Sequence, residues 1–275
     1  RDPYLSRGLG MCIRDSPLVL KSIKLIQKVP KRYMLGMFVG CGLPYLLVAG
    51  TGMQLAPVSD GSALIPGTLP LFVSGIAVVL FRQPLSSHRI LGLMLVLGGI
   101  AAFLFQGFGH SGNGLLTGYV LFLLGSMMWA TFTICARVSN LNPLVAAGVI
   151  SLLSTLGLIT LIATGMLKSH LIVTSVANWP WKELAGHITL QGIGAGLVAA
   201  FTYLHAISVL GAERTAAFGA ATPAIATLLA IPVFNEQPTL LGWFALIMVC
   251  VGSLIASNIF MKQDTSLLYQ PPKFK

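Results

Sequence analysis

Residues 59–86 read SDGSALIPGTLPLFVSGIAVVLFRQPLS, and residues 212–239 read AERTAAFGAATPAIATLLAIPVFNEQPT. The two stretches align without a gap at an offset of 153 residues, and the alignment continues past both of them. The matched positions include Asp60 with Glu213, Pro70 with Pro223, Ala77 with Ala230, Phe81 with Phe234 and Gly99 with Gly252. Because the offset holds over two successive apolar stretches, we interpret it as an internal repeat and not as a chance match of apolar composition.

The composition of the whole chain agrees with these apolar stretches. Hydrophobic residues make up 55% of the 275 residues and charged residues only 9%, against about 25% charged in an average soluble protein. So few charges cannot cover a soluble globule of this size, which excludes a soluble enzyme, a disordered chain and a collagen-like fibre. The apolar runs are long and unbroken, whereas the strands of an outer-membrane barrel alternate apolar and polar residues. The composition therefore predicts an all-α membrane protein, a polytopic helical bundle.

Eight apolar runs are long enough to cross a bilayer, whose hydrocarbon core of about 30 Å needs about 20 residues of helix. Short segments rich in Gly, Pro, Asn, Ser and charged residues separate the runs, as is typical of turns. The expected spans are 33–56, 61–81, 89–108, 115–137, 143–166, 190–210, 214–234 and 239–261.

The basic residues collect in alternate loops. With the Lys21–Arg32 segment placed in the cytoplasm, and residues 1–16 left out, 12 Lys and Arg residues fall on that side. Only two, Lys168 and Lys182, fall on the other side. Such a bias sets the topology of membrane proteins, so we expect a multi-pass protein with a cytoplasmic C-terminus. The net charge of +10 is thereby assigned to topology, and nucleic acid is not expected as a partner.

The repeat is predicted to be inverted. Five spans separate 61–81 from its counterpart 214–234, and an odd number of crossings turns the second copy upside down. The loops agree, because 82–89 contains two Arg residues whereas its counterpart 235–242 contains no Lys or Arg. Inverted repeats that enclose a site near the membrane midplane are typical of secondary transporters.

The first sixteen residues do not fit this repeat. At the same offset, the counterpart of the span 143–166 would occupy residues 1–13, but this segment carries Arg1, Asp2 and Arg7, which are costly inside a bilayer. Its continuation MCIRDS is the translation of a sequencing-library adapter, so we expect a non-native start and eight of ten helices. The expected organisation is a non-native segment at 1–16, the remainder of the first repeat at 17–108, the second repeat at 114–261 and a cytoplasmic tail at 262–275.

Short motifs in both halves of the chain resemble the EamA family of the drug/metabolite transporter superfamily, over roughly residues 17–261. The motifs are Ala63–Pro66, Leu69–Leu71, Gly118-Tyr119, Trp129-Ala130, Gly211–Ala217, Thr222-Pro223, Asn235–Thr239 and Gly252. The resemblance implies two inverted five-helix repeats and transport of small metabolites, often outward, across a bacterial inner membrane. One departure is Gln83, where the family usually has an acidic residue; Glu236 keeps that residue in the second half.

On these grounds we expect a secondary transporter that exports a small polar or amphipathic metabolite by alternating access. A membrane channel or a structural membrane protein is the alternative. An intramembrane enzyme is less expected, because it would need clustered His, Asp or Glu side chains and the spans offer His205 nearly alone. The expected partners are a small-molecule substrate and the lipid bilayer, with a homodimer as a further option through small-residue patterns such as Gly36-x-x-x-Gly40.

No cofactor and no metal are expected. The chain has no motif for ATP binding, and its four cysteines lie far apart in the sequence. We interpret Cys41, Cys135 and Cys250 as small hydrophobic residues within the membrane.

The candidate substrate-contacting residues are polar or helix-breaking residues inside the spans. Uncompensated polar groups in hydrocarbon cost several kcal/mol, so these side chains should face the bundle interior or a wet cavity. A proline frees a carbonyl one turn earlier, and such carbonyls can line a polar cavity. The candidates are Tyr45, Gln54, Pro70, Trp129, Thr202, Tyr203, His205 and Pro223, with Thr133 considered beside Trp129. Helix–helix hydrogen bonds and packing kinks are the alternative roles at these positions.

Three charged residues lie at expected helix starts, namely Asp60, Glu213 and Arg214. An acidic side chain there suits the positive end of the helix dipole, so we place these residues near the membrane interface. No carboxylate is expected at the midplane.

Overall fold

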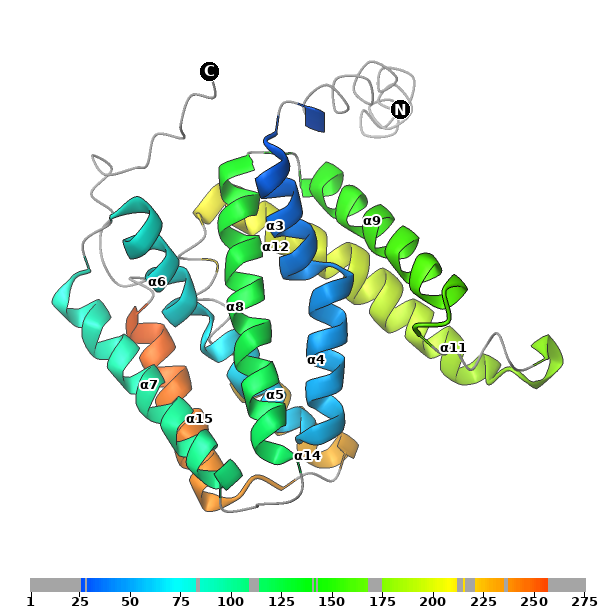
Figure 1. Cartoon of the computed structure of the whole chain (residues 1–275). Coiled ribbons are helices and arrows are strands. Elements are labelled where there is room, and N and C mark those ends of the chain that lie inside the picture. Colours follow the sequence, from blue (N-terminus) through cyan, green and yellow to red (C-terminus); the bar gives the residue numbers. More distant parts are fainter. Residues whose placement is uncertain are drawn as a thin grey trace, which may run out of the picture.

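The computed structural model describes a bundle of helices (Figure 1), and all of the regular structure in its described part is helical. The described residues are 26–27, 29–82, 85–108, 114–139, 141, 143–167, 175–211, 215, 221–234 and 237–256. Several residues of the sequence-based predictions lie outside them, namely 1–16, Gln83, Glu213, Arg214, Glu236 and the tail 262–275.

Each of the eight expected spans coincides with one or more helices. The helices are α3 (Lys31–Cys41), α4 (Leu43–Leu55), α5 (Val58–Gly67), α6 (Leu69–Phe81), α7 (Ser87–Phe108), α8 (Leu115–Ser139), α9 (Pro143–Ala163), α11 (Trp181–His187), η2 (Ile188–Ala199), α12 (Ala200–Leu210), α14 (Ala221–Phe234) and α15 (Leu240–Ala256). A short 3₁₀ turn at Val176–Asn178 precedes α11, and η2 is a π-helical stretch that joins α11 to α12 without a break.

Six helical runs within the described ranges are long and apolar enough to cross a membrane, and α14 and α15 are shorter apolar helices. The six runs are Lys31–Leu55, Val58–Leu80, Ser87–Phe108, Leu115–Ser139, Val145–Ala163 and Trp181–Leu210. Large hydrophobic side chains such as Val79, Phe105 and Leu240 are exposed on the outside of the bundle. Since lipid tails accept such a surface, the chain is a multi-pass membrane protein.

Two of the expected spans are broken in the middle. The first break is at Gly42, between α3 and α4, and the Ser154 hydroxyl of α9 accepts a hydrogen bond from the Leu43 amide at 3.0 Å. The second is at Thr68, between α5 and α6, where Pro66 and Pro70 cannot supply backbone N–H groups. There the Ser253 hydroxyl of α15 donates to the Gly67 carbonyl. Side chains of neighbouring helices therefore satisfy the backbone groups that each break frees.

Helices α7 and α15 pack closely through small residues. A Cβ atom at Gly99 would lie 2.6 Å from Val249 Cγ2, and a Cβ atom at Gly252 would lie 2.9 Å from Val96 Cγ2. Both valines are fully buried. The helices run antiparallel, because Gly92 meets the C-terminal end of α15 at Ala256 whereas Gly99 meets its middle. The exchanged valine–glycine contacts are reciprocal, as they are across a two-fold axis.

Helix α8 runs through the middle of the bundle and contacts helices of both halves of the chain (Figure 1). Gly36 and Gly40 of α3 face it, so that a Cβ atom at Gly40 would lie 2.7 Å from Phe132 Cβ. At the other end of α8, a Cβ atom at Gly118 would lie 2.7 Å from Ala56 Cβ. The small-residue pattern Gly36-x-x-x-Gly40 is thus used for packing within the chain.

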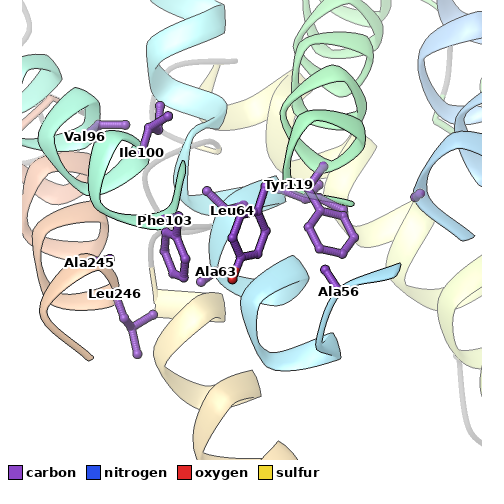
Figure 2. Packing of buried hydrophobic residues seen from close by; sticks show 12 residues of the cluster. Ala56, Ala63, Leu64, Val96, Ile100, Phe103, Tyr119, Ala245 and Leu246 are labelled. Atoms are coloured by element: carbon purple, nitrogen blue, oxygen red, sulfur yellow. The ribbon is translucent and has the colours of Figure 1, made fainter. Parts of the chain in front are cut away.

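The largest cluster of buried apolar side chains (Figure 2) joins α4, α5, α7 and α15 to the first half of α8, and its largest members are Phe103, Tyr119 and Phe122. By contrast, α9 and the α11–α12 run slant away from α7 and α15 in Figure 1. They pack on α8 and α3 through a second cluster, which contains Met37, Phe132 and Leu204.

Candidate functional site

Four aromatic side chains from three helices meet in the interior of the bundle. Tyr45 comes from α4, Trp129 and Phe132 from α8, and Tyr203 from α12. The Trp129 ring lies edge-on between two tyrosines, with centroid distances of 5.4 Å to Tyr45 and 5.8 Å to Tyr203. Phe132 stacks on Tyr203 at 6.3 Å. These separations and angles are those at which aromatic rings attract one another, and we name the four residues the aromatic cluster.

Trp129 occupies the centre of this arrangement. It lies near the middle of the 25-residue helix α8, far from both of its ends. Its half-buried side chain borders all three hydrophobic clusters of the described chain.

Polar atoms in and beside the aromatic cluster include some that are hydrogen-bonded and some that are not. Thr133 donates to the Trp129 carbonyl at 2.9 Å, which leaves its hydroxyl oxygen to accept from the Tyr203 hydroxyl at 3.2 Å. The indole nitrogen Nε1 of Trp129 is buried and makes no hydrogen bond of regular geometry among the described residues, although it lies close enough to the Tyr203 hydroxyl to interact with it. Ser126 Oγ, one turn earlier on α8, is also buried and has no hydrogen-bond partner among the described residues. Nearly all buried polar groups in proteins are paired, so two unpaired donors three residues apart require an explanation.

Gly125, next to Ser126 in the sequence, lies against the Tyr45 ring. The Tyr45 ring passes over it, with Cε2 3.6 Å from the position of an added Cβ, and Ile65 lies 4.0 Å away. The four residues of the aromatic cluster, and Ser126 and Thr133 beside them, carry no charged side chain. The site therefore offers aromatic faces and neutral hydrogen-bond donors.

The two repeated prolines lie near each other in the structure. Pro223 is almost fully buried, and its Cγ atom is 3.5 Å from the position that a Cβ of Gly67 would take, at the break before Pro70. The Pro70 carbonyl accepts a hydrogen bond from Ser74 Oγ at 2.5 Å. Ser74 Oγ in turn accepts two from the buried guanidinium of Arg89, at 2.8 and 3.1 Å. The carbonyl of Pro70 itself is therefore already hydrogen-bonded to Ser74 in this conformation.

The remaining candidates lie apart from the aromatic cluster, on exposed positions. Gln54 is exposed on α4, and Thr202 is exposed and donates to the Val198 carbonyl of its own helix at 2.9 Å. His205 is exposed and stacks on Phe201 with a centroid distance of 5.9 Å. The structure thus brings together three of the eight candidates, Tyr45, Trp129 and Tyr203.

Sequence reasoning passed over Ser126 as a candidate. The available signal was its spacing from Trp129, because residues three apart lie on the same face of a helix. A serine inside an apolar span is common, however, and only the packing of Tyr45 over Gly125 shows that this face points inward.

The described helices that are long enough to span a membrane define a polytopic membrane protein, and the aromatic cluster with its buried polar atoms lies in its interior. Residues 116–258 match the sequence profile of the EamA-like transporter family, which is more than half of the chain. The chain belongs to this family, and the membership indicates a membrane transporter.

The overall fold also matches solved structures. One of them, whose title reads only "Crystal structure of protein", has a TM-score of 0.55 and 18% sequence identity. The match covers 82% of this chain and 76% of that one. At this identity the likeness shows the fold alone. No curated protein matches the chain.

Proposed function

We propose that this chain is a secondary carrier that moves a small organic molecule across the membrane by alternating access, with the aromatic cluster as its substrate site. The observation that carries the proposal is the pair of unpaired buried donors, Trp129 Nε1 and Ser126 Oγ, beside the stacked rings. A bound molecule with a hydrogen-bond acceptor would satisfy both donors, and its apolar part would contact the rings.

The chemistry of these groups favours a particular kind of substrate. Neutral donors and aromatic faces suit a molecule with a flat or apolar body and one or more acceptor oxygens or nitrogens. Because none of these residues is charged, selection of a substrate by net charge is not favoured there. A small amphipathic metabolite fits this description.

The proposed architecture is a pair of inverted repeats, at 17–108 and 114–261. The reciprocal contacts between α7 and α15 support it, because Val96 and Val249 are equivalent positions of the repeat, as are Gly99 and Gly252. Antiparallel packing of two equivalent helices is the arrangement expected across a two-fold axis in the membrane plane. The broken helix at Thr68 adds support, since transporters often build their sites near discontinuous helices.

The proposed topology places the C-terminus in the cytoplasm of a bacterium, in the inner membrane, and the direction of transport is outward. The basis is the distribution of Lys and Arg over the loops, which follows the positive-inside rule. Reporter fusions at the C-terminus that are active only in one compartment test this placement.

Counterflow in proteoliposomes tests the carrier function. Liposomes containing the purified chain are loaded with a defined mixture of small polar and amphipathic metabolites, and exchange is followed by mass spectrometry. A carrier gives saturable exchange of a few compounds that empty liposomes do not show. Non-saturating ion conductance without exchange would instead indicate a channel and would contradict the proposal.

A further inference from the structure

A second polar group of residues lies at the end of the bundle where α4 meets α5. The Tyr119 hydroxyl donates to Asp60 Oδ2 at 2.8 Å, and the Gln106 amide nitrogen donates to the Tyr119 oxygen at 3.3 Å. The Thr239 hydroxyl donates to Gln106 Oε1 at 2.8 Å, and the Gly242 amide donates to the Thr239 oxygen at 3.0 Å. We name these residues the Asp60 chain.

All four hydrogen bonds point the same way. Each member of the chain donates toward Asp60 and accepts from the next member, so the carboxylate is the final acceptor. In such a row each hydrogen bond polarises the next one and strengthens it. A carboxylate fits the end of this row, because it only accepts hydrogen bonds whereas a protonated acid also carries a donor.

The chain is buried where it meets the carboxylate. Tyr119 is 0% exposed and Asp60 6% exposed. Figure 2 shows Tyr119 among the apolar side chains of the main cluster, close to Ala63, Leu64 and Phe103. Water does not compete for the Tyr119–Asp60 bond in this conformation, so the bond contributes more than it would at a surface.

The chain also crosses between the two halves of the sequence at each of the three steps from Asp60 to Thr239. Asp60 and Gln106 belong to α5 and α7 of the first half, whereas Tyr119 belongs to α8 and Thr239 precedes α15 in the second half. Any movement that separates α8 from α5 and α7 at this end must break both hydrogen bonds of the Tyr119 oxygen.

We propose that Asp60 is a proton-binding site, and that its protonation releases α8 from α5 and α7 and opens this end of the bundle. Protonation replaces a charge-assisted hydrogen bond, which is roughly twice as strong as a neutral one, and introduces a donor where the chain already supplies one. The inference rests on the proposed carrier function, in which the two ends of the bundle open in turn. In the proposed topology this end faces away from the cytoplasm.

Few other titratable groups lie on the elements packed against α5. Their described residues are Tyr45 on α4, Tyr119, Cys135 and Arg137 on α8, and Cys250 on α15, with none on α6 or α14. Cys135 and Arg137 lie at the opposite end of α8 from Tyr119. On α7, His88 and Arg89 likewise lie in the first turn, whereas Gln106 lies in the last. Asp60 is the one carboxylate on the described residues of these helices.

Distance measurements between spin labels test the proposal without requiring transport. The four cysteines are replaced, and labels are attached at Thr117→Cys on α8 and Leu240→Cys on α15, two exposed positions beside the chain. Distances are recorded in lipid nanodiscs from about pH 8 to about pH 3, a range that includes the ordinary pKa of an aspartate near 3.9.

In the parent protein, acidification is expected to shift the ratio of long to short distances by about tenfold, the size that corresponds to losing one hydrogen bond to a charged group. D60N is expected to give the same distribution at both ends of the pH range. Y119F removes the donor and keeps the ring, and is expected to show the long distance throughout. T155V, which removes an exposed hydroxyl that bonds only to its own helix at Ser151, is the matched control and keeps the parent's response.

A parent distribution that does not change with pH would overturn the proposal, as would an unchanged pH response in D60N. If D60N does not fold, Y119F provides the comparison, because it removes the hydrogen bond on which the pH response depends and should abolish that response. Failure of the distance test leaves counterflow intact, whereas failure of the carrier function appears as absent counterflow with a normal distance response. The two failures are therefore distinguishable.

Discussion

The aromatic cluster and the Asp60 chain each include a residue of α8, Trp129 and Tyr119, and these two lie about three turns apart. The two groups differ in how their polar atoms are paired. In the Asp60 chain the Tyr119 hydroxyl both donates and accepts, and it joins α8 to α5 and α7. In the aromatic cluster Trp129 Nε1 and Ser126 Oγ are buried without a hydrogen bond of regular geometry among the described residues. Paired polar atoms hold helices together, whereas unpaired donors cost stability and are retained where a ligand can satisfy them.

The largest expected effect comes from Trp129→Ala. It removes the ring that borders all three hydrophobic clusters, so the free energy of unfolding should fall by about 3–5 kcal/mol. Titration with SDS in mixed micelles, followed by circular dichroism, measures this change. A loss below about 1 kcal/mol would show that Trp129 does not connect the clusters.

Tyr119→Phe should have the next largest effect on stability. It keeps the packing of the ring but leaves both Asp60 and Gln106 without the tyrosine hydroxyl, at a cost of about 1–3 kcal/mol. The same SDS titration measures it. An unchanged free energy of unfolding would mean that the hydrogen bonds of the Tyr119 hydroxyl do not stabilise the bundle. The Asp60 chain would then not differ from the aromatic cluster in this respect.

How much of this could be predicted from the sequence differs between the two regions. The helical spans followed from hydrophobicity and turn residues, and Tyr45, Trp129 and Tyr203 were identified because polar aromatic residues inside a span need an inward place. Asp60 was assigned to the helix dipole at the interface. Its burial depends on Tyr119 and Gln106 from two other helices, and no spacing in the sequence indicates that contact.

The breaks at Gly42 and Thr68 show the same limit. The prolines around Thr68 predict a kink, but whether the helix bends or stops depends on groups such as Ser253 that satisfy the freed carbonyls. Thr202, Tyr203 and His205 are equivalent in the sequence, yet of the three only Tyr203 faces α8, because the packing of α12 decides which of its faces is covered. Gln54 lies on an exposed face of α4.

Trp129→Phe is the counterpart of Tyr119→Phe, because it removes an unpaired donor whereas Tyr119→Phe removes a paired one. Its free energy of unfolding should change by less than about 1.5 kcal/mol, since the volume of the ring is largely kept and no hydrogen bond is lost. A loss as large as that of Tyr119→Phe would mean that the indole nitrogen has a structural partner.

Ser126→Ala should have the smallest effect. Removing an unpaired buried hydroxyl leaves stability unchanged or raises it by a few tenths of a kcal/mol, because a desolvation cost disappears. Substrate affinity should fall by about threefold, as measured by the KM of counterflow. Reduced stability with unchanged KM would assign Ser126 to packing.

The most direct test of the substrate site is the KM of counterflow for Trp129→Phe, measured with the compound that the exchange screen identifies and beside Thr155→Val as the matched control. If the indole N–H binds substrate, KM rises about tenfold while the control stays at the parental value, and both variants keep parental unfolding behaviour. A KM for Trp129→Phe equal to that of the parent and the control would contradict the assignment of the aromatic cluster as the substrate site.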